Sequence, residues 1–161
     1  ALLILQNEVT EALNIAAAIA ARQRGVKVCL NAAPVRPLAT SLVALVDILV
    51  VNAVEAQAMT GVAVTSLATA RDAAAALARR FPTAVVTAGS DGVAATSAGA
   101  AAISLPARPV EVISTHGAGD VFVGTLCAAI AQGKALGDAL ERANAEAARQ
   151  VSGRGGAEAG L

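Results

Sequence analysis

The sequence predicts an α/β fold: a layered α/β/α architecture around a mostly parallel sheet. Strand-like apolar segments alternate with alanine-rich helical segments, in the order that generates parallel strands. The segment at 47–52 is apolar almost throughout, which is typical of a strand buried on both faces. Hydrophobic residues make up 56% of the chain but aromatic residues only 1%, so small aliphatic side chains must build the core, and these suit closely packed layers.

The first half is expected to contain, in order, a strand at 1–5, a helix at about 9–24, a strand at 26–32, a short helix at about 38–45 and a strand at 47–52. The first helix ends at Gly25, because glycine adopts the left-handed conformation of a helix cap without steric cost. A helix between two strands supplies the crossover that parallel pairing needs. These three strands are therefore predicted to be parallel.

The second half is expected to contain a helix at about 53–60, a helix opened by Ser66 or Thr69 and running to Arg80, strands at 83–89, 92–98 and 101–107, a strand-like run at 110–114, and helices at about 118–132 and 136–151. Gly61 stops the first of these helices. Asp72 near the start of the second and Arg79-Arg80 at its end match the helix dipole. Tight turns between the three strands predict antiparallel pairing.

Polar and glycine-rich segments follow the predicted strands at the point where each strand ends. Asn31 and Asn52 follow the second and third strands, and Thr87–Gly92 follows the fourth. The run Ser114–Asp120 follows the strand-like segment at 110–114. Because ligands bind at the carboxyl ends of strands in such sheets, we expect one edge to hold all four.

The run Ser114–Asp120 has the composition of an anion-binding helix start. Gly117 and Gly119 let the backbone approach an anion closely, and the amides of Gly117, Ala118 and Gly119 would point at it with the helix dipole behind them. Asp120 could take a proton from an attacking hydroxyl beside a neutralised phosphate. A helix-opening Asp after Gly is also a common plain cap, so the residues alone leave that alternative open.

Three other candidates have ordinary structural alternatives. Asn52 with Glu55 has the spacing of a capping box, and Ser90-Asp91-Gly92 is a common turn sequence. His116 is the only histidine, but a lone histidine is weak evidence for a catalytic base. Glu8 follows the first strand, where acids are usually solvated.

Composition excludes several function classes. Twelve basic residues balance twelve acidic ones and no Tyr or Trp is present to stack bases, so nucleic-acid binding has no support. No apolar run approaches the roughly 18 to 20 residues of a membrane span. No basic region precedes residues 1–5, so we expect a cytoplasmic protein. Cys29 and Cys127 are expected to be buried free thiols.

Four motifs together resemble the ribokinase (PfkB-type) carbohydrate kinases over nearly the whole chain. They are the LNAAPVRPL segment at 30–38, NAVE at 52–55, TAGSDG at 87–92 and STHGAGD at 114–120. The resemblance implies a ribokinase-like fold and ATP-dependent phosphorylation of a hydroxymethyl group of ribose or a related small sugar. Asp120 would be the general base, and Gly117, Ala118 and Gly119 would supply the anion hole.

The resemblance also implies roles for the remaining candidates. Glu55 would hold Mg²⁺ through water, and Glu8 would bind the sugar together with Asp120. The nucleotide would contact Asn52, Gly119, Asn144 and the loop formed by Thr87, Ala88, Gly89, Ser90, Asp91 and Gly92. The full-length protein is expected to be a homodimer.

The chain departs from the family in two ways. Ser114 replaces an Asp that, with the His116 carbonyl and the loop near Gly153–Gly160, would surround a monovalent cation, so we expect weakened K⁺ activation. Family members are roughly twice as long, so 1–161 is expected to be a partial domain without the N-terminal strands and the lid. Two alternatives stay open: a non-catalytic nucleotide-binding relative, and a nucleoside or fructose kinase of the same family.

Overall fold

The computed structural model describes residues 1–153, which fold around one sheet of six strands in the order β1-β2-β3-β4-β5-β6. The strands are β1 (Leu2–Gln6), β2 (Lys27–Asn31), β3 (Ile48–Asn52), β4 (Thr83–Thr87), β5 (Val93–Ser97) and β6 (Ile103–Leu105). The first four pair in parallel, and the last two pair antiparallel. The predicted mostly parallel α/β sheet is confirmed, including the antiparallel pairing at its end.

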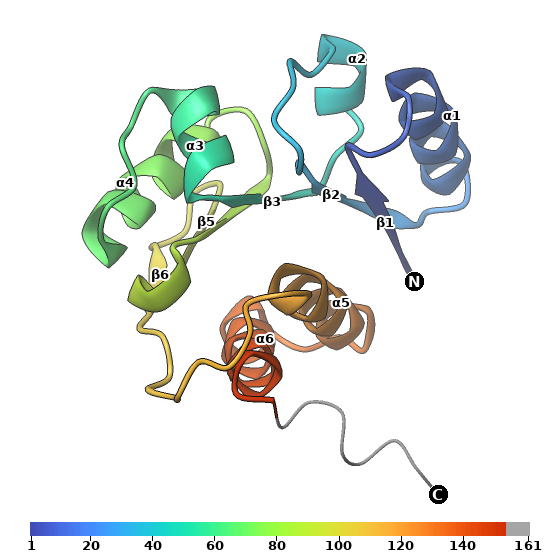
Figure 1. Cartoon of the computed structure of the whole chain (residues 1–161). Coiled ribbons are helices and arrows are strands. Elements are labelled where there is room, and N and C mark those ends of the chain that lie inside the picture. The colour runs from blue at the N-terminus through green and yellow to red at the C-terminus, as the bar shows by residue number, and fades with distance from the viewer. Residues whose placement is uncertain (154–161) are drawn as a thin grey trace, which may run out of the picture.

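Helices cover both faces of this sheet. They are α1 (Glu11–Arg22), α2 (Thr40–Val43), α3 (Ala53–Thr60), α4 (Leu67–Leu77), α5 (Ala118–Ala131) and α6 (Leu136–Val151). In Figure 1 the first four lie above the sheet, and α5 and α6 lie together below it. The chain therefore forms three layers, with the last two helices making one layer by themselves.

Local sequence signals explain where the helices begin and end. Gly61 has a φ of 76° and ends α3 in the left-handed conformation, as expected. Ser66 caps α4 and accepts a hydrogen bond from the Thr69 backbone, while the Thr69 side chain returns the contact. The predicted bounds of α3, α5 and α6 agree with the structure to within one residue. The first two helices begin two residues later than predicted, because Thr10 and Ala39 are still extended where the apolar pattern had already begun, and they also end two residues earlier. The helix predicted to run to Arg80 ends at Leu77.

Two hydrophobic clusters hold the layers together, one on each face. The cluster under α1 to α4 includes Leu30, Leu49 and Val86, and the cluster against α5 and α6 includes Val50 and Val85. Neighbouring residues of β3 and β4 thus alternate between the two clusters, as a strand buried on both faces requires. Many helix positions facing the sheet are fully buried alanines, which explains how a chain almost without aromatic residues fills its core.

The four parallel strands each end in a polar residue, and all four polar side chains share one face. These residues are Gln6, Asn31, Asn52 and Thr87. Each lies two or four positions after a residue of the cluster that packs on α5 and α6, so strand alternation directs each one to that side. The carboxyl edge of the sheet therefore presents a row of polar groups toward the start of α5.

The strand predicted at 110–114 is wrong. This segment has no regular secondary structure, and its Val112 and Ile113 are 58% and 72% exposed. Its backbone bonds instead to the end of α6, where the amides of Ile113 and Ser114 both donate to the Val151 carbonyl at 2.7 and 3.1 Å. The alternating apolar pattern had no neighbouring strand to pair with among the described residues.

Cys29 on β2 and Cys127 on α5 are buried free thiols, as predicted. They meet in the cluster between the sheet and α5, which their distance in the sequence did not suggest. A hydrogen bond to Cys127, together with burial, raises the pKa of Cys29 well above its ordinary value. The same hydrogen bond lowers the pKa of Cys127, although burial opposes this shift. The protonated Cys29 thiol therefore acts as a small apolar residue in this core.

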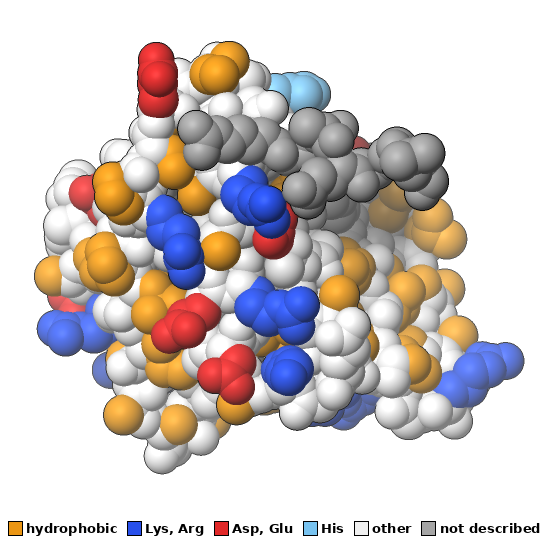
Figure 2. Space-filling model, turned by 90° about the horizontal axis from the view of Figure 1, so that it is seen from below, with side chains coloured by type: hydrophobic (Ala, Val, Ile, Leu, Met, Phe, Trp, Pro, Cys, Tyr) orange, Lys and Arg blue, Asp and Glu red, His pale blue; other side chains and the backbone are white. Residues whose placement is uncertain are grey.

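The side of the molecule below the sheet carries charged side chains of both signs among hydrophobic ones. Figure 2, which views the molecule from this side, shows Lys and Arg side chains interspersed with Asp and Glu. The two cysteines described above lie beneath it. Within residues 1–153, none of the helices has the length and apolar character needed to cross a bilayer.

Candidate active site

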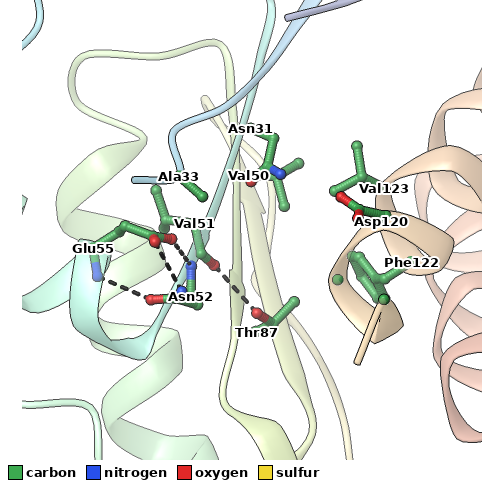
Figure 3. Close-up of a pocket in the computed structure, with 12 residues that line it drawn as sticks. Asn31, Ala33, Val50, Val51, Asn52, Glu55, Thr87, Asp120, Phe122 and Val123 are labelled. Carbon is green, nitrogen blue, oxygen red and sulfur yellow. Dashed lines mark hydrogen bonds between the residues drawn. The ribbon is translucent and has the colours of Figure 1, made fainter. Parts of the chain in front are cut away.

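A cavity of about 180 Å³ lies between the carboxyl edge of the sheet and the start of α5. Figure 3 shows α3 and the strand ends on one side and the first turn of α5 on the other. Its lining residues are Asn31, Ala33, Val50, Val51, Asn52, Glu55, Thr87, Gly117, Gly119, Asp120, Phe122 and Val123. The predicted convergence of strand ends and glycine loop at one edge is thus present in the structure.

Asn52 and Glu55 form a complete capping box at the start of α3. The Asn52 side-chain oxygen accepts from the amides of Val54 and Glu55 at 2.9 and 3.0 Å. The Glu55 carboxylate accepts from the Asn52 backbone at 2.7 Å and from its side-chain amide at 2.8 Å. Glu55 is only 5% exposed, so its charge is held beside the cavity by these two donors. The pair therefore caps α3, as the sequence spacing allowed, and both residues also line the cavity.

The start of α5 supplies backbone amides and one acid. Gly117 is the N-cap, with a φ of 74°, and no side chain caps the helix. Within the described residues the Gly119 amide has no hydrogen-bond partner, whereas the Ala118 amide donates to the Thr115 carbonyl at 3.3 Å. The unpaired amide, together with the helix dipole, favours an anion at the cavity. Asp120 lies in the same turn and is exposed. Its Oδ1 accepts a hydrogen bond from Nε2 of Gln6, at the end of β1, at 3.2 Å.

The predicted nucleotide loop, Thr87–Gly92, is a tight connection between β4 and β5. Thr87 lines the cavity and donates from Oγ1 to the Val51 carbonyl at 3.4 Å. Gly89–Asp91 form a short 3₁₀ turn, and the Ala88 amide donates to the Gly92 carbonyl at 2.8 Å. Gly92 has a φ of 117°, and a Cβ there would lie 2.1 Å from the Leu105 carbonyl oxygen. The last glycine of the motif is thus required by packing against the end of β6.

Asn144 on α6 lies next to this loop rather than in the cavity wall. Its Nδ2 donates to the Pro106 carbonyl at 2.8 Å. Gly92 approaches the same stretch of chain, because its hypothetical Cβ would also meet backbone atoms of Pro106 and Ala107 at 2.8 Å. The loop after β4 and the last helix, both predicted for the nucleotide, are thereby joined through one segment.

The residues predicted for the monovalent cation, and Glu8 predicted for the sugar, lie outside the cavity wall. Ser114 Oγ accepts from the His116 amide at 3.2 Å, and the His116 carbonyl accepts from Nε2 of Gln150 at 3.3 Å. Both oxygens expected around a monovalent cation therefore already have a protein donor. Of the loop near Gly153–Gly160, only Gly153 belongs to the described residues. Glu8 is exposed and is not among the residues that line the cavity.

Sequence reasoning missed the apolar part of the cavity and one polar contact. Phe122 and Val123, in the first turns of α5, form an apolar wall that a helical pattern presents simply as core. Gln6 donates a hydrogen bond to Asp120. Its position could have been predicted in the same way as that of Asn31, because each is the polar residue that ends a parallel strand. Asn31 lines the cavity as its strand-end position suggested.

The chemistry of the cavity fits a divalent cation held mainly by phosphate and water. Among residues 1–153 no group of three or more His, Cys, Asp or Glu side chains could form a metal cage. Glu55 and Asp120 line opposite sides of the cavity, and each Glu55 oxygen keeps a lone pair beyond the one it uses to accept from Asn52. Mg²⁺ typically keeps several waters and one or two carboxylates at phosphate sites. Glu55 suits that arrangement as an acceptor from metal-bound water.

A three-layer α/β fold with an open helix N-terminus and a carboxylate at the carboxyl edge of its sheet has the arrangement typical of the α/β proteins that bind phosphorylated ligands at that edge. More narrowly, the chain belongs to the pfkB family of carbohydrate kinases, whose family description matches residues 2–160. The sequence resemblance stated above is thereby confirmed.

Individual relatives agree with this assignment. The chain is 35% identical to a ribokinase of Haemophilus influenzae over 140 residues, covering 86% of this chain and 45% of the relative. It is also 35% identical to a ribokinase of Mus musculus over 158 residues, covering 95% and 49%. The structure of Arabidopsis thaliana ribokinase complexed with ribose and ATP superposes with a TM-score of 0.84 and 30% identity, covering 92% of this chain and 48% of that one. The chain thus spans about half the length of the relatives it matches.

Proposed function

We propose that the protein carrying this chain is an ATP-dependent sugar kinase that phosphorylates a hydroxymethyl group of ribose or a related small sugar. One observation carries the proposal: Asp120 lies in the first turn of an uncapped helix and faces the Asn52–Glu55 pair across one cavity. A base, an anion-binding helix start and an acid suited to hydrated Mg²⁺ are the groups that phosphoryl transfer requires.

In the proposed step, the acceptor hydroxyl oxygen attacks the γ-phosphorus and forms a new O–P bond. The bond from the γ-phosphorus to the bridging oxygen breaks in line with it, and ADP leaves. Asp120 accepts the hydroxyl proton, and the amides of Gly117 and Gly119 donate to the transferring oxygens as their charge develops. The Ala118 amide would join them by exchanging its 3.3 Å bond to the Thr115 carbonyl for one to the phosphoryl group. Mg²⁺, when bound, would neutralise charge on the phosphates. Phe122 and Val123 keep one wall of the cavity apolar, which limits competing water.

The nucleotide is proposed to extend from the cavity over the Thr87–Gly92 loop toward Asn144. Two features support this direction. The loop leaves the cavity at Thr87, and its far end packs on the segment that Asn144 contacts. The proposed path therefore follows one continuous surface from the helix start to the last helix.

The acceptor is proposed from the comparisons. Ribose and ATP are the ligands named for the Arabidopsis ribokinase structure, which superposes on most of this chain. Fructose and nucleosides are the competing acceptors, since they carry the same primary hydroxyl group. The choice between them is an outcome of the test below.

The test is a phosphotransfer assay on the full-length protein with ATP, Mg²⁺ and a panel containing ribose, fructose, adenosine and pseudouridine. We expect ribose to give the highest kcat/KM, and Asp120→Asn to lower kcat by about 10² to 10⁴ while ATP still binds. Asp138→Asn is the matched control, because Asp138 is an exposed acid in the first turn of α6, away from the cavity. Transfer to no acceptor, with ATP binding intact, would favour a non-catalytic nucleotide-binding relative. Near-wild-type turnover of Asp120→Asn would remove Asp120 from the role of base.

A further inference from the structure

We propose that Gln6 is a positioning residue that orients the Asp120 carboxylate for phosphoryl transfer; this inference rests on the function proposed above. Gln6 is the last residue of β1, and its Nε2 donates to Asp120 Oδ1 at 3.2 Å. The two residues are 114 positions apart, so the contact joins the sheet edge directly to the first turn of α5.

The backbone that carries Gln6 is held from several sides. Asn14 on α1 is 1% exposed, and its Nδ2 donates to the Gln6 carbonyl at 2.9 Å. Gln6 is in register with Asn31 at the end of β2. The next residue, Asn7, is 4% exposed and donates from Nδ2 to the carbonyls of Ala32 and Pro34, both at 3.1 Å. A donor on such a fixed backbone can restrict its partner, whereas a donor on a mobile loop cannot.

Asp120 is a residue that needs such a restraint. It is exposed in the first turn of α5, where solvent would let the side chain sample several rotamers. The contact from Gln6 occupies Oδ1, and within the described residues Oδ2 receives no hydrogen bond. Oδ2 is therefore the atom left to accept the proton of an acceptor hydroxyl in the cavity. Fixing the geometry of a reacting group in this way raises kcat and leaves the affinity for substrate unchanged.

The type of side chain also fits this role. A glutamine amide donates to the carboxylate without bringing a charge or a proton that could transfer to it. A glutamate in its place would put a second acid against Asp120, and a methionine would keep the length and remove the donor. These two substitutions therefore separate the hydrogen bond from the packing of the side chain.

The experiment compares Gln6→Met and Gln6→Glu in the full-length protein with Gln57→Met, which changes an exposed glutamine on α3 outside the cavity wall. We expect Gln6→Met to lower kcat about tenfold and Gln6→Glu to lower it further, with KM for ATP and the thermal midpoint unchanged. The control should match the wild type. Unchanged kcat in Gln6→Met, or a loss confined to KM or stability, would overturn the proposal.

A double variant separates this inference from the proposed function. If Gln6 acts through Asp120, Gln6→Met should cause no further loss of kcat in an Asp120→Asn background. A full additional tenfold loss there would show that Gln6 acts elsewhere and would overturn the positioning role. If Asp120→Asn alone keeps wild-type turnover, the base assignment itself fails, and the role of Gln6 fails with it. Loss in Asp120→Asn without loss in Gln6→Met would overturn only the inference.

Discussion

Asn52 and Glu55 cap one another at the start of α3, with both Glu55 oxygens accepting from Asn52 at 2.7 and 2.8 Å. The pair thus serves helix formation and the cavity wall at the same time. Glutamine also completes a capping box, because its carbonyl oxygen can accept from the N-cap backbone. The structural and the metal-related roles of Glu55 can therefore be measured in one variant.

We expect Glu55→Gln to lower the free energy of unfolding by about 1 to 2 kcal/mol, because the amide NH₂ replaces one of the two oxygens that accept from Asn52. Mg²⁺ at a higher concentration should also be needed for half-maximal phosphotransfer. Denaturant unfolding and a Mg²⁺ titration of activity measure the two effects. Asn52→Ala is the comparison variant, because it removes the cap and should also cost about 1 kcal/mol. An unchanged Mg²⁺ requirement in Glu55→Gln would leave Glu55 with the capping role alone.

Gly92→Ala is expected to destabilise the protein by about 2 to 4 kcal/mol. The φ of 117° is unfavourable for alanine, and the new Cβ would lie 2.1 Å from the Leu105 carbonyl oxygen. Gly99→Ala is the matched control, since Gly99 has a φ of 76° but no atom within 4 Å of a Cβ. Its cost should be about 1 to 2 kcal/mol. Equal unfolding free energies for the two variants would show that the contact with β6 is not the constraint.

Ser114→Asp is expected to increase the stimulation of activity by K⁺. A carboxylate adds charge where the serine supplies only an oxygen, and that oxygen already accepts from the His116 amide. Initial rates in KCl and in tetramethylammonium chloride measure the response. Complete loss of wild-type activity in tetramethylammonium, with no effect of Ser114→Asp, would mean that carbonyl oxygens suffice and that the charge argument is wrong.

The 161-residue chain expressed by itself is expected to self-associate, to bind hydrophobic dyes and to phosphorylate no sugar. β1 is an edge strand of the described sheet, and Ile4 on it is 40% exposed, as are Leu13 at 56% and Ile19 at 43% on α1. Ile4→Lys should reduce the association, because a charge on an edge strand opposes pairing. Size-exclusion chromatography decides the matter: a sharp monomer peak that phosphorylates ribose would contradict this expectation.

Much of the fold was predictable because its signals are local. Gly61 and Ser66 mark helix ends by their own conformations, and the apolar runs of β3 and β4 need no partner to be recognised. The segment at 110–114 shows the limit, because its alternating pattern is that of a strand and yet no strand lies beside it among the described residues. A segment forms a strand only where a neighbouring strand can pair with it, and the local sequence pattern does not reveal that neighbour.

The candidate site was predictable as far as each residue marks a strand end or a glycine loop. Asn52, Thr87 and Asp120 come together at one cavity as expected. The contact between Gln6 and Asp120 depends on how α5 sits against β1, which no spacing in the sequence encodes. The packing of Phe122 and Val123 against the cavity has the same origin.

Four strand-end side chains point to the same side of the carboxyl edge, so each can be substituted independently of the others. They are Gln6, Asn31, Asn52 and Thr87. Each of these residues follows the last core residue of its strand, so substituting it leaves both hydrophobic clusters intact. Deleting one residue inside any of these strands has the opposite effect, because it reverses the two faces of the strand beyond the deletion. The polar strand-end side chain then points toward α1 to α4, and apolar side chains point toward the cavity. Ligand preference in this architecture can therefore drift by substitution, while strand length stays fixed.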